Sequence, residues 1–162
     1  MKNTIMLCLA LFSLLFLNVT YANQDKQLMC LAKNIYYEAG AESLAGKKAV
    51  AQVTINRTNH PSYPSSICGV VHQRTKSTCQ FSWVCEPRKT IKTSSENWQQ
   101  SVEVAELFLT GSYEYDRLTN DTLFFHTKDL PFTWKRKYKQ VAVIGNHIFY
   151  RTKTKNGNQR RD

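Results

Sequence analysis

The stretch Asn34-Ile35-Tyr36-Tyr37-Glu38-Ala39-Gly40-Ala41-Glu42 places an acidic residue directly behind two tyrosines. Apolar residues from Leu28 to Tyr36 recur at helical spacing, which predicts a helix that ends near Gly40. Because a carboxyl group held against aromatic and aliphatic surface is disfavoured in its charged form, we expect the pKa of Glu38 to be raised. A raised pKa suits a general acid in sugar chemistry, so Glu38 is the first candidate for catalysis.

The two glutamates of this stretch have different alternative explanations. Glu38 lies beside the apolar stripe of its helix, where most glutamates are solvated surface residues. An acid near a helix C-terminus opposes the helix dipole by about 0.3–1 kcal/mol, however, so helix stability does not explain Glu38. Glu42 precedes the next helix, where the dipole favours an acid. Glu42 therefore ranks below Glu38, and we expect it at most to share the same groove.

Further helices follow this stretch. Ser43 is a suitable N-cap for a helix that extends to about Arg57, and Ser95 for a stronger amphipathic helix that ends before Gly111. Residues 67–73 have the pattern of a short helix. Residues 77–94 are irregular and rich in cysteine, aromatic residues and lysine. Such a long loop in a compact domain is usually functional or cross-linked.

The last third of the chain changes to the pattern of strands. Residues 122–126 have strand character, and residues 140–144 and 147–151 form a predicted hairpin. Its loop, Gly145-Asn146, has glycine first, which suits a type II′ turn. Helices in the N-terminal part followed by a small antiparallel element predict an α+β domain.

The N-terminus has the composition of an export signal. A positively charged start precedes an apolar run over residues 5–19, and small residues allow cleavage after Ala22. We expect a signal peptide at residues 1–22. The alternative is an uncleaved membrane anchor, but a membrane-spanning helix needs about 20 apolar residues and this run is shorter. Residues 23–151 then form one domain, and the basic tail 152–162 is expected to be disordered. The predicted location is secreted, periplasmic or in the cell wall, without stable membrane insertion after cleavage.

Charge and cysteine content narrow the partners and the chemistry. The chain has 22 Lys+Arg against 12 Asp+Glu, a net charge of +10, which suits cell-wall polymers, lipid headgroups or nucleic acid. The charges are dispersed, and pairs such as Lys47-Lys48 are interpreted as solvated surface. Four cysteines in an exported chain predict two disulfides, and the sequence allows three connectivities. The alternative is a zinc site formed by all four thiolates, but the sequence has no Cys-x-x-Cys pair. The cysteines concerned are Cys30, Cys68, Cys79 and Cys85.

Two further groups of residues are candidates for a site. Cys79-Gln80-Phe81-Ser82-Trp83 combines aromatic faces with an amide and a hydroxyl, as in sugar-binding sites; the alternative is a loop anchored in the core by its aromatic residues. His126 and His147 form a candidate acid/base pair, or are half-buried strand histidines. No His-Glu-x-x-His motif, Gly-x-Ser-x-Gly elbow or phosphate-binding loop occurs, so we expect neither metal nor cofactor.

The order of these motifs resembles the SleB-type cell wall hydrolases, the family of the spore cortex-lytic enzymes. The resemblance extends from Cys30 to about Arg151, and several separate blocks in the right order make it specific. The matching stretches are Cys30–Ala39, Ala49–Val53, Asn56-Arg57, Tyr63-Pro64, Ile67–Val71, Cys79–Trp83, Phe125-His126 and His147–Tyr150.

The resemblance implies that residues 23–151 are a lysozyme-like α+β catalytic domain that cleaves the glycan strand of peptidoglycan. Glu38 takes the place of the general acid/base. The family is similar in action to lytic transglycosylases, in which one acid protonates the glycosidic oxygen and then deprotonates the muramic acid C6 hydroxyl to close a 1,6-anhydro ring. The residues expected to bind substrate are Tyr37, Glu42, Gln80, Phe81, Ser82 and His126.

Three different functions stay open beside a lytic transglycosylase. A hydrolytic muramidase or glucosaminidase normally needs a second carboxylate, but none of the available acids lies in a matched motif. These acids are Glu86, Asp116, Asp121 and Asp129. The second possibility is a peptidoglycan-binding module without activity, and the third is a basic ribonuclease that uses the two histidines. We expect a monomer that binds peptidoglycan and not nucleic acid.

The sequence departs from the family pattern beside Glu38. The family commonly has Glu-Ala-Arg-Gly-Glu-Pro, where this chain has Glu38-Ala39-Gly40-Ala41-Glu42-Ser43. The missing arginine removes a partner for Glu38 or for substrate. Substrate preference and the pKa of Glu38 are the properties that this difference affects.

Overall fold

The helices come first along the chain and the strands last. The computed structural model describes residues 2–86, 90–111, 117–130 and 137–153, with side chains from residue 21 onward. The helices within these ranges are α1 (Lys2–Ala39), α2 (Leu44–Thr58), α3 (Ile67–Val71), the 3₁₀ helix η1 (Ser82–Val84) and α4 (Glu96–Leu109). The strands are β1 (Thr122–Thr127), β2 (Tyr138–Ile144) and β3 (His147–Thr152). This order confirms the predicted α+β class.

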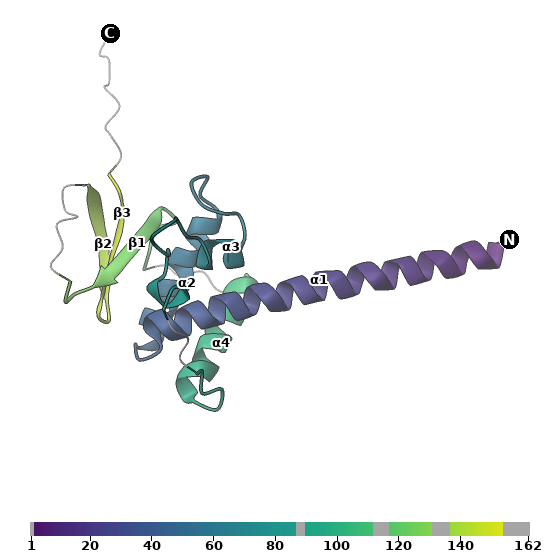
Figure 1. Ribbon diagram of the computed structural model, residues 1–162, viewed down its shortest axis with the longest axis horizontal. Coiled ribbons are helices and arrows are strands. Elements are labelled where there is room, and N and C mark those ends of the chain that lie inside the picture. The colour runs from purple at the N-terminus through teal and green to yellow at the C-terminus, as the bar shows by residue number, and fades with distance from the viewer. Residues whose placement is uncertain (1, 87–89, 112–116, 131–136, 154–162) are drawn as a thin grey trace, which may run out of the picture.

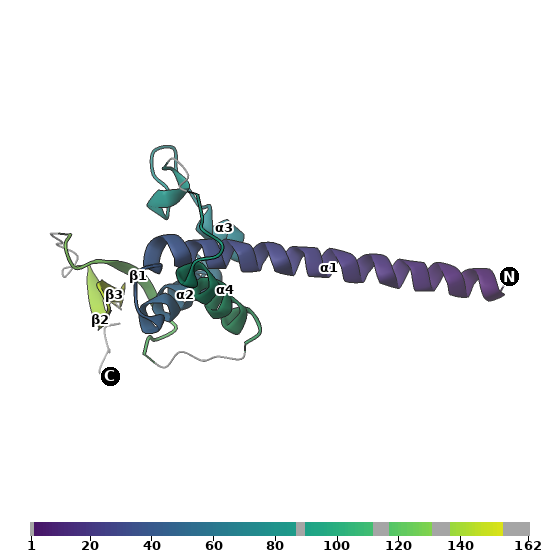
Figure 2. The ribbon, with the colours of Figure 1, turned by 90° about the horizontal axis from the view of Figure 1, so that it is seen from below.

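The long helix α1 contains the predicted helix 28–39 and extends it toward the N-terminus. Its C-terminal part lies among α2, α3 and α4, and its N-terminal part projects away from them (Figures 1 and 2). Leu31 and Ile35 are completely buried, which confirms the apolar stripe. Among the residues whose side chains are described, no helix is long and apolar enough to cross a membrane.

Serine caps begin the shorter helices. The Ser43 side chain accepts a hydrogen bond from the backbone N–H of Gly46 at the start of α2, and Ser95 accepts one from Trp98 at the start of α4. Both caps confirm the predictions, because a side-chain oxygen satisfies an N–H that the first helical turn leaves free. The short helix α3 ends at Val71, earlier than the predicted Gln73.

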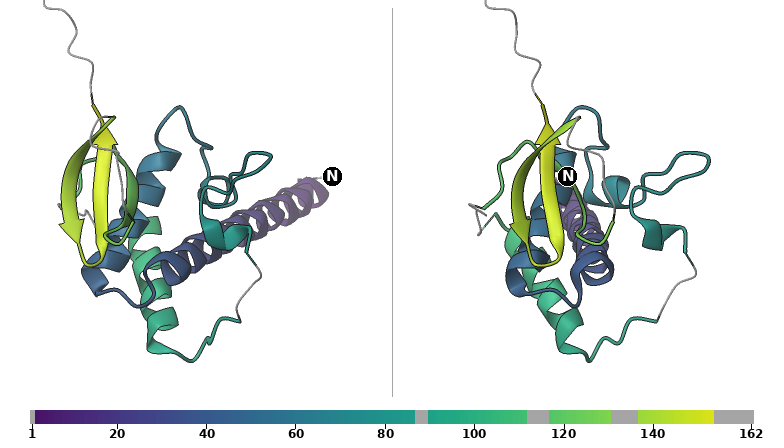
Figure 3. Two further views of the ribbon diagram at one scale, coloured as in Figure 1. Left: turned by 60° about the vertical axis from the view of Figure 1, so that its left-hand side comes forward. Right: turned by 90° about the vertical axis from the view of Figure 1, so that its left-hand side faces the viewer.

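The strands form one antiparallel sheet with the order β1-β3-β2, shown at its fullest in Figure 3. The hairpin of β2 and β3 confirms the prediction, and β1 adds a third strand on the other side of β3. Gly145 has a φ of 57°, and no non-glycine residue among those described has a positive φ. A positive φ at the first loop residue alone fits the predicted type II′ turn.

Helix α2 joins the helical part of the molecule to the sheet. Its residue Ala51 belongs to a buried cluster formed with α1, α3 and α4. Its residues Ala49 and Val53 belong to a second cluster, with Ile144 and Phe149 of the sheet. Helix α2 therefore packs between the two clusters, and Arg57 in its last turn reaches the site described below.

Lys47 corrects one expectation from the sequence. The sequence pattern predicts solvated surface for the pair Lys47-Lys48, but Lys47 is only 1% exposed. Its ammonium group donates hydrogen bonds to the carbonyl oxygens of Gly40 at 2.9 Å and Glu42 at 2.7 Å. A buried cation is tolerated where such acceptors satisfy it. Lys47 thus holds the turn between α1 and α2 from inside.

Two disulfides are present, and the structure chooses one of the three connectivities. Cys30–Cys68 links α1 to α3 across a sequence separation of 38 residues. Cys79–Cys85 closes a short loop around η1, with a separation of 6. The first bridge fixes the relative position of two helices, and the second shapes the loop that carries Gln80, Phe81 and Ser82.

Candidate active site

A pocket of about 440 Å³ lies where the end of α1, the loop before η1 and strand β1 meet. It brings together Glu38 and the predicted residues Gln80, Phe81, Ser82 and His126, which come from three separate parts of the chain. The described residues of its wall are Glu38, Arg57, Cys79, Gln80, Phe81, Ser82, Phe124, Phe125, His126, Thr127, Leu130 and His147.

Glu38 is the only carboxyl group among these described wall residues. Its pKa is raised from 4.5 to about 7, mainly because burial disfavours the charged form. The positive charge of Arg57 lowers this pKa and the negative charge of Glu86 raises it, and both effects are smaller than that of burial. Glu38 therefore has the property expected from the sequence: it exchanges a proton near neutral pH.

Arg57 supplies a positive charge to the pocket wall from the last turn of α2. Its side chain is 3% exposed, and its Nε donates a hydrogen bond to the carbonyl oxygen of Leu123 in β1 at 2.9 Å. Burial lowers the pKa of Arg57 to about 10, while interactions with Tyr63 and Glu38 raise it. The guanidinium stays charged at neutral pH. Arg57 thus lowers the pKa of Glu38 from a position distant in the sequence from Gly40, where the family commonly has an arginine.

Sequence reasoning missed Arg57 as a site residue. In the sequence, the Asn56-Arg57 pair is only one of the stretches that resemble the family. Arginine at the end of a helix is usually exposed, where it can interact with the last carbonyl groups. Only the packing of α2 against β1 turns this side chain inward.

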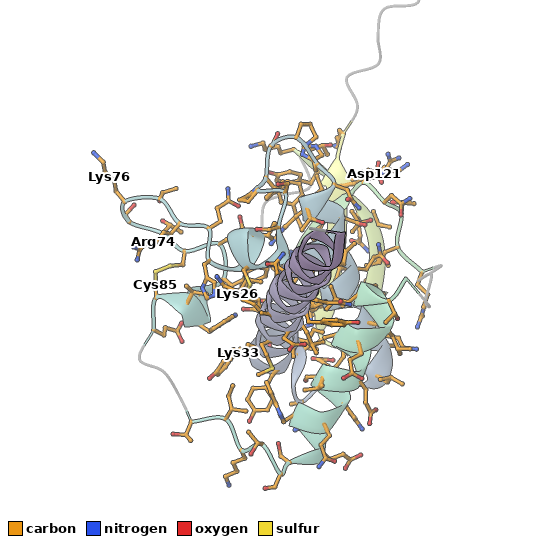
Figure 4. The ribbon with its side chains drawn as sticks, turned by 90° about the vertical axis from the view of Figure 1, so that its right-hand side faces the viewer. Lys26, Lys33, Arg74, Lys76, Cys85 and Asp121 are labelled. Atoms are coloured by element: carbon orange, nitrogen blue, oxygen red, sulfur yellow. A yellow bond between two sulfur atoms is a disulfide. The ribbon has the colours of Figure 1, made fainter. Side chains whose placement is uncertain are left out.

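The loop from Cys79 to Glu86 is held by contacts with α1. The indole Nε1 of Trp83 donates to Oδ1 of Asn34 at 3.0 Å, and Asn34 in turn donates to Thr54 of α2 at 3.1 Å. The Tyr37 ring stacks on Trp83 with 4.6 Å between ring centroids. Figure 4 shows Cys85 on this loop, next to the projecting loop that carries Arg74 and Lys76. Tyr37 and Trp83 therefore hold this loop against α1.

His126 lies in the pocket wall with both ring nitrogens engaged. Nδ1 is 2.7 Å from the carbonyl oxygen of Thr127, and Nε2 is 3.0 Å from the hydroxyl of Tyr150. Because a carbonyl oxygen only accepts, Nδ1 donates in the neutral ring and Nε2 accepts from Tyr150. His126 is thereby fixed in orientation, and both of its ring nitrogens are committed to contacts within the protein.

His147 and Glu42 lie next to each other beside the hairpin. Glu42 Oε2 accepts a hydrogen bond from the backbone N–H of Asn146 at 3.1 Å, and Oε1 is 3.9 Å from Nδ1 of His147. Burial lowers the pKa of His147, although Glu42 raises it, so the ring is neutral at neutral pH. Glu42 and Tyr37 are not among the described wall residues, so the structure does not gather them with the other predicted residues.

The other acids named from the sequence lie away from this wall. Glu86 is exposed at the end of the loop, close enough to raise the pKa of Glu38. Asp121 pairs with Arg151 at 2.7 Å, and Asp129 bonds the side chain of Asn146. Asp116 lies outside the described residues. In the described part of the chain, no group of three or more His, Cys, Asp or Glu residues is arranged to hold a metal ion.

Known proteins resemble this chain in sequence. The family described as Cell Wall Hydrolase matches residues 41–150, a range that begins three residues after Glu38. The spore cortex-lytic enzyme of Bacillus subtilis (strain 168) is 30% identical over 132 residues, which cover 80% of this chain and 38% of the relative. That of Halalkalibacterium halodurans is 29% identical over 132 residues, covering 82% and 37%. The chain thus spans less than half the length of these curated relatives.

Solved structures also resemble it. The catalytic domain of the germination-specific lytic transglycosylase SleB from Bacillus anthracis superposes with a TM-score of 0.58 at 26% identity, over 77% of this chain and 93% of that chain. The catalytic domain of the Bacillus cereus SleB protein gives a TM-score of 0.57 at 28% identity, over 80% and 91%. These likenesses confirm the expected lysozyme-like α+β fold.

Proposed function

The chain belongs to the Cell Wall Hydrolase family, and we propose that it cleaves the glycan strands of peptidoglycan by the non-hydrolytic route of a lytic transglycosylase. The observation that carries this proposal is Glu38, a carboxyl group with a pKa of about 7 and the only one in the described wall of the pocket. The likeness to the catalytic domain of a lytic transglycosylase supports the same class of reaction.

In the first step, Glu38 donates its proton to the glycosidic oxygen. With a pKa of about 7, about half of the Glu38 carboxyl groups hold a proton at neutral pH, whereas an ordinary glutamate with a pKa near 4.5 holds almost none. The bond between C1 of the muramic acid residue and the leaving oxygen breaks. The leaving sugar departs with a hydroxyl group, and positive charge develops at C1.

In the second step, the Glu38 carboxylate accepts the proton of the C6 hydroxyl of the same muramic acid residue. The C6 oxygen forms a bond to C1, which closes the 1,6-anhydro ring without consuming water. Glu38 ends protonated, as it began, so one carboxyl group performs both transfers. Arg57 favours this double role, because it opposes the effect of burial and keeps both protonation states of Glu38 accessible.

Two of the remaining wall residues are assigned to direct substrate binding: Gln80 offers an amide and Ser82 a hydroxyl to a sugar ring. Phe81 is only 3% exposed and packs on the Arg57 guanidinium, so it shapes the wall from the core side. His126, with both ring nitrogens bonded within the protein, would contribute only the surface of its ring. Tyr37 and Glu42, also predicted to bind substrate, would act indirectly. Tyr37 supports the loop through its stacking on Trp83, and Glu42 holds the turn of the hairpin.

Product analysis tests this function. Purified sacculi are digested with the wild-type protein and with Glu38→Gln, and the soluble products are identified by mass spectrometry. We expect anhydro-muropeptides from the wild type and none from Glu38→Gln. Hydrated reducing ends, heavier by one water molecule, would show hydrolysis instead, and sedimentation with sacculi without release would show a binding module. Degradation of RNA that Glu38→Gln leaves unchanged would show the ribonuclease.

Substitution of Glu86 tests the hydrolytic alternative. It is the second acid that acts on Glu38, and its charge raises the pKa of Glu38. If Glu86 activated a water molecule, Glu86→Gln would abolish the formation of hydrated ends. We expect Glu86→Gln to release the same anhydro products as the wild type, with only the small change in pH dependence that the loss of one charge causes.

We also propose that the chain acts outside the inner membrane, as a monomer. Residues 1–22 would be removed as a signal peptide. The catalytic domain would extend from residue 23 to Thr152, one residue beyond the predicted boundary, because Thr152 is the last residue of β3 and pairs with Tyr138. The rest of the basic tail would lie outside the domain. N-terminal sequencing of the exported protein tests the cleavage after Ala22, and gel filtration tests the monomeric state. An intact N-terminus on the exported protein would contradict the first proposal.

A further inference from the structure

Arg57 is a buried cation whose hydrogen-bonding capacity is only partly used. It lines the pocket together with Glu38, and its Nε is engaged by the carbonyl oxygen of Leu123. Its Nη1 is also buried and has no hydrogen-bond partner among the described residues. Leaving such a donor without an acceptor is unfavourable, because the water lost on burial is not replaced. Because Arg57 is one of the residues that line the pocket, a ligand held there can supply an acceptor to the guanidinium.

The guanidinium is fixed in place before any ligand arrives. Its central carbon lies 5.5 Å from the centroid of the Tyr63 ring and 5.1 Å from that of the Phe81 ring. Aromatic faces on a planar cation, together with the bond from Nε, restrict its rotation. Phe81 belongs to the same pocket wall. A donor group that is already ordered binds a ligand at a lower entropic cost.

Glu38 does not pair with the positively charged guanidinium of Arg57. The two residues line the same pocket, but among the described residues they do not form an ion pair, unlike Arg151 and Asp121. The Glu38 carboxyl is partly protonated near neutral pH, which weakens any competition for the guanidinium. Arg57 is thus left for an acceptor on the substrate.

We infer that Arg57 is a substrate-binding residue whose guanidinium binds a carbonyl or carboxylate oxygen of the muramic acid residue held beside Glu38. The inference rests on the proposed function. An arginine binds planar oxygen acceptors better than it binds hydroxyl groups, because its donors are arranged as a fork. Muramic acid carries two such groups, the 2-acetamido carbonyl and the carbonyl of the 3-O-lactyl group.

Asn56 provides a matched control on the same turn of α2. Its Nδ2 donates to the carbonyl oxygens of Thr119 at 3.0 Å and Thr122 at 2.9 Å, so it fastens α2 to β1 much as Arg57 does through Leu123. Asn56 is not among the described residues of the pocket wall. The variant Asn56→Ala therefore measures the loss of fastening without the loss of a ligand contact.

The experiment compares kcat and KM of wild type, Arg57→Met, Arg57→Lys and Asn56→Ala on solubilised glycan strands, with Tm measured for each. We expect Arg57→Met to raise KM by about 10- to 100-fold, as for a charged hydrogen bond, with a smaller change in kcat. Arg57→Lys keeps the positive charge but lacks the forked pair of guanidinium donors, so its KM should lie between those of Arg57→Met and the wild type. Asn56→Ala lowers Tm and leaves KM unchanged.

Two modified substrates distinguish the two acceptor groups. If Arg57 binds the acetamido carbonyl, the KM ratio of Arg57→Met to wild type falls to one on N-deacetylated strands. If it binds the lactyl carbonyl, the ratio grows on strands stripped of stem peptides, because the neutral carbonyl becomes a carboxylate. A ratio of one on the unmodified strands, with the wild type active, would overturn the inference and leave the proposed function standing. A wild type that releases nothing would overturn the proposed function itself.

The pH profile separates binding from a merely structural role. Arg57 lowers the pKa of Glu38, so Arg57→Met should extend activity to higher pH, whereas Asn56→Ala should not move the profile. Glu86 acts on Glu38 in the opposite direction, and His126 and His147 share the pocket. If Arg57→Met does not fold, Arg57→Lys carries the test: a KM equal to that of the wild type would overturn the inference.

Discussion

Glu38 and Glu42 lie one helical turn apart in the sequence, yet the structure gives them opposite surroundings. Glu38 lines the pocket, and no described residue donates a hydrogen bond to its carboxyl group, whose pKa is about 7. Glu42 accepts a hydrogen bond from the backbone of Asn146 and lies 3.9 Å from His147. One carboxyl group is available to a ligand, and the other is committed to the hairpin. Residue type and spacing alone would not have separated these roles.

Lys47 keeps the two glutamates in their separate positions. Its buried ammonium group binds the carbonyl oxygens of Gly40 and Glu42, so it fixes the turn between them. The orientation of each carboxyl group therefore depends on a residue five positions beyond Glu42. Substitutions of Glu38, Glu42 or Lys47 therefore test the difference between the two glutamates.

The largest expected effect is on catalysis. Glu38→Gln should lower kcat by about 10³-fold, because a positioned general acid/base contributes about 10²- to 10⁴-fold. Glu42→Gln, the matched control, should stay within about tenfold of the wild type, since its amide oxygen can still accept from Asn146. The initial rate of muropeptide release measures both. Equal losses in the two variants would contradict the assigned difference.

The second effect is on stability and has a defined dependence on pH. The pKa of Glu38 is about 7 when folded against 4.5 as its ordinary value, so the folded state binds more protons between these pH values. The free energy of unfolding therefore falls as pH rises through this window, by about 3 kcal/mol in total. The free energy of unfolding of Glu38→Gln should not show this decrease, because the amide does not titrate. The variant should match the wild type near pH 4 and be more stable near pH 8.

Urea unfolding of both proteins at the two pH values measures this difference. Each comparison is made between variants at one pH, so the titration of other groups cancels. A stability difference that does not change with pH would show that burial does not raise the pKa of Glu38. The expected result combines loss of activity with a gain in stability, which a general disruption of the fold would not produce.

The third effect concerns the turn itself. Lys47→Met should lower the free energy of unfolding by about 2–3 kcal/mol, because the carbonyl oxygens of Gly40 and Glu42 lose a charged donor. Lys48→Met, on the half-buried neighbouring position, controls for the loss of one positive charge. Denaturant unfolding measures both variants. A change of equal size in Lys48→Met would assign the effect to net charge instead of the turn.

The smallest effect is local to the hairpin. Glu42→Ala removes the acceptor of the Asn146 backbone N–H and should cost about 1 kcal/mol. Hydrogen exchange of the Asn146 amide should become faster, while the same amide in Glu38→Ala should exchange at the wild-type rate. Unchanged exchange in Glu42→Ala would show that the contact does not hold the turn in solution.

Much of the fold was predictable because its signals are local. Ser43 and Ser95 cap their helices through N–H groups three residues away, and Gly145 supplies the positive φ that its own turn requires. The predicted residues of the site include Glu38 and the segment Gln80–Ser82, which the pocket does bring together. Their residue types and the resemblance of the surrounding stretches pointed to the same chemistry.

The remaining features depend on contacts between distant parts of the chain. The inward position of Arg57 depends on Leu123, 66 residues later, and the role of Glu42 on Asn146, 104 residues later. The connectivity of the disulfides follows from the packing of α1 against α3, which places Cys30 beside Cys68. The burial of Lys47 likewise results from packing and not from its neighbours in the sequence.

The sequence by itself determined the order of helices and strands, the identity of Glu38 as the candidate acid and the segment expected to grip a sugar. These follow from spacing, caps and turns, in which the interacting groups lie within a few residues of one another. Only the tertiary structure decided which charges are buried, which glutamate faces the pocket, and that Arg57 is the cation beside Glu38. The physical reason is that desolvation and charge interaction depend on distance in space.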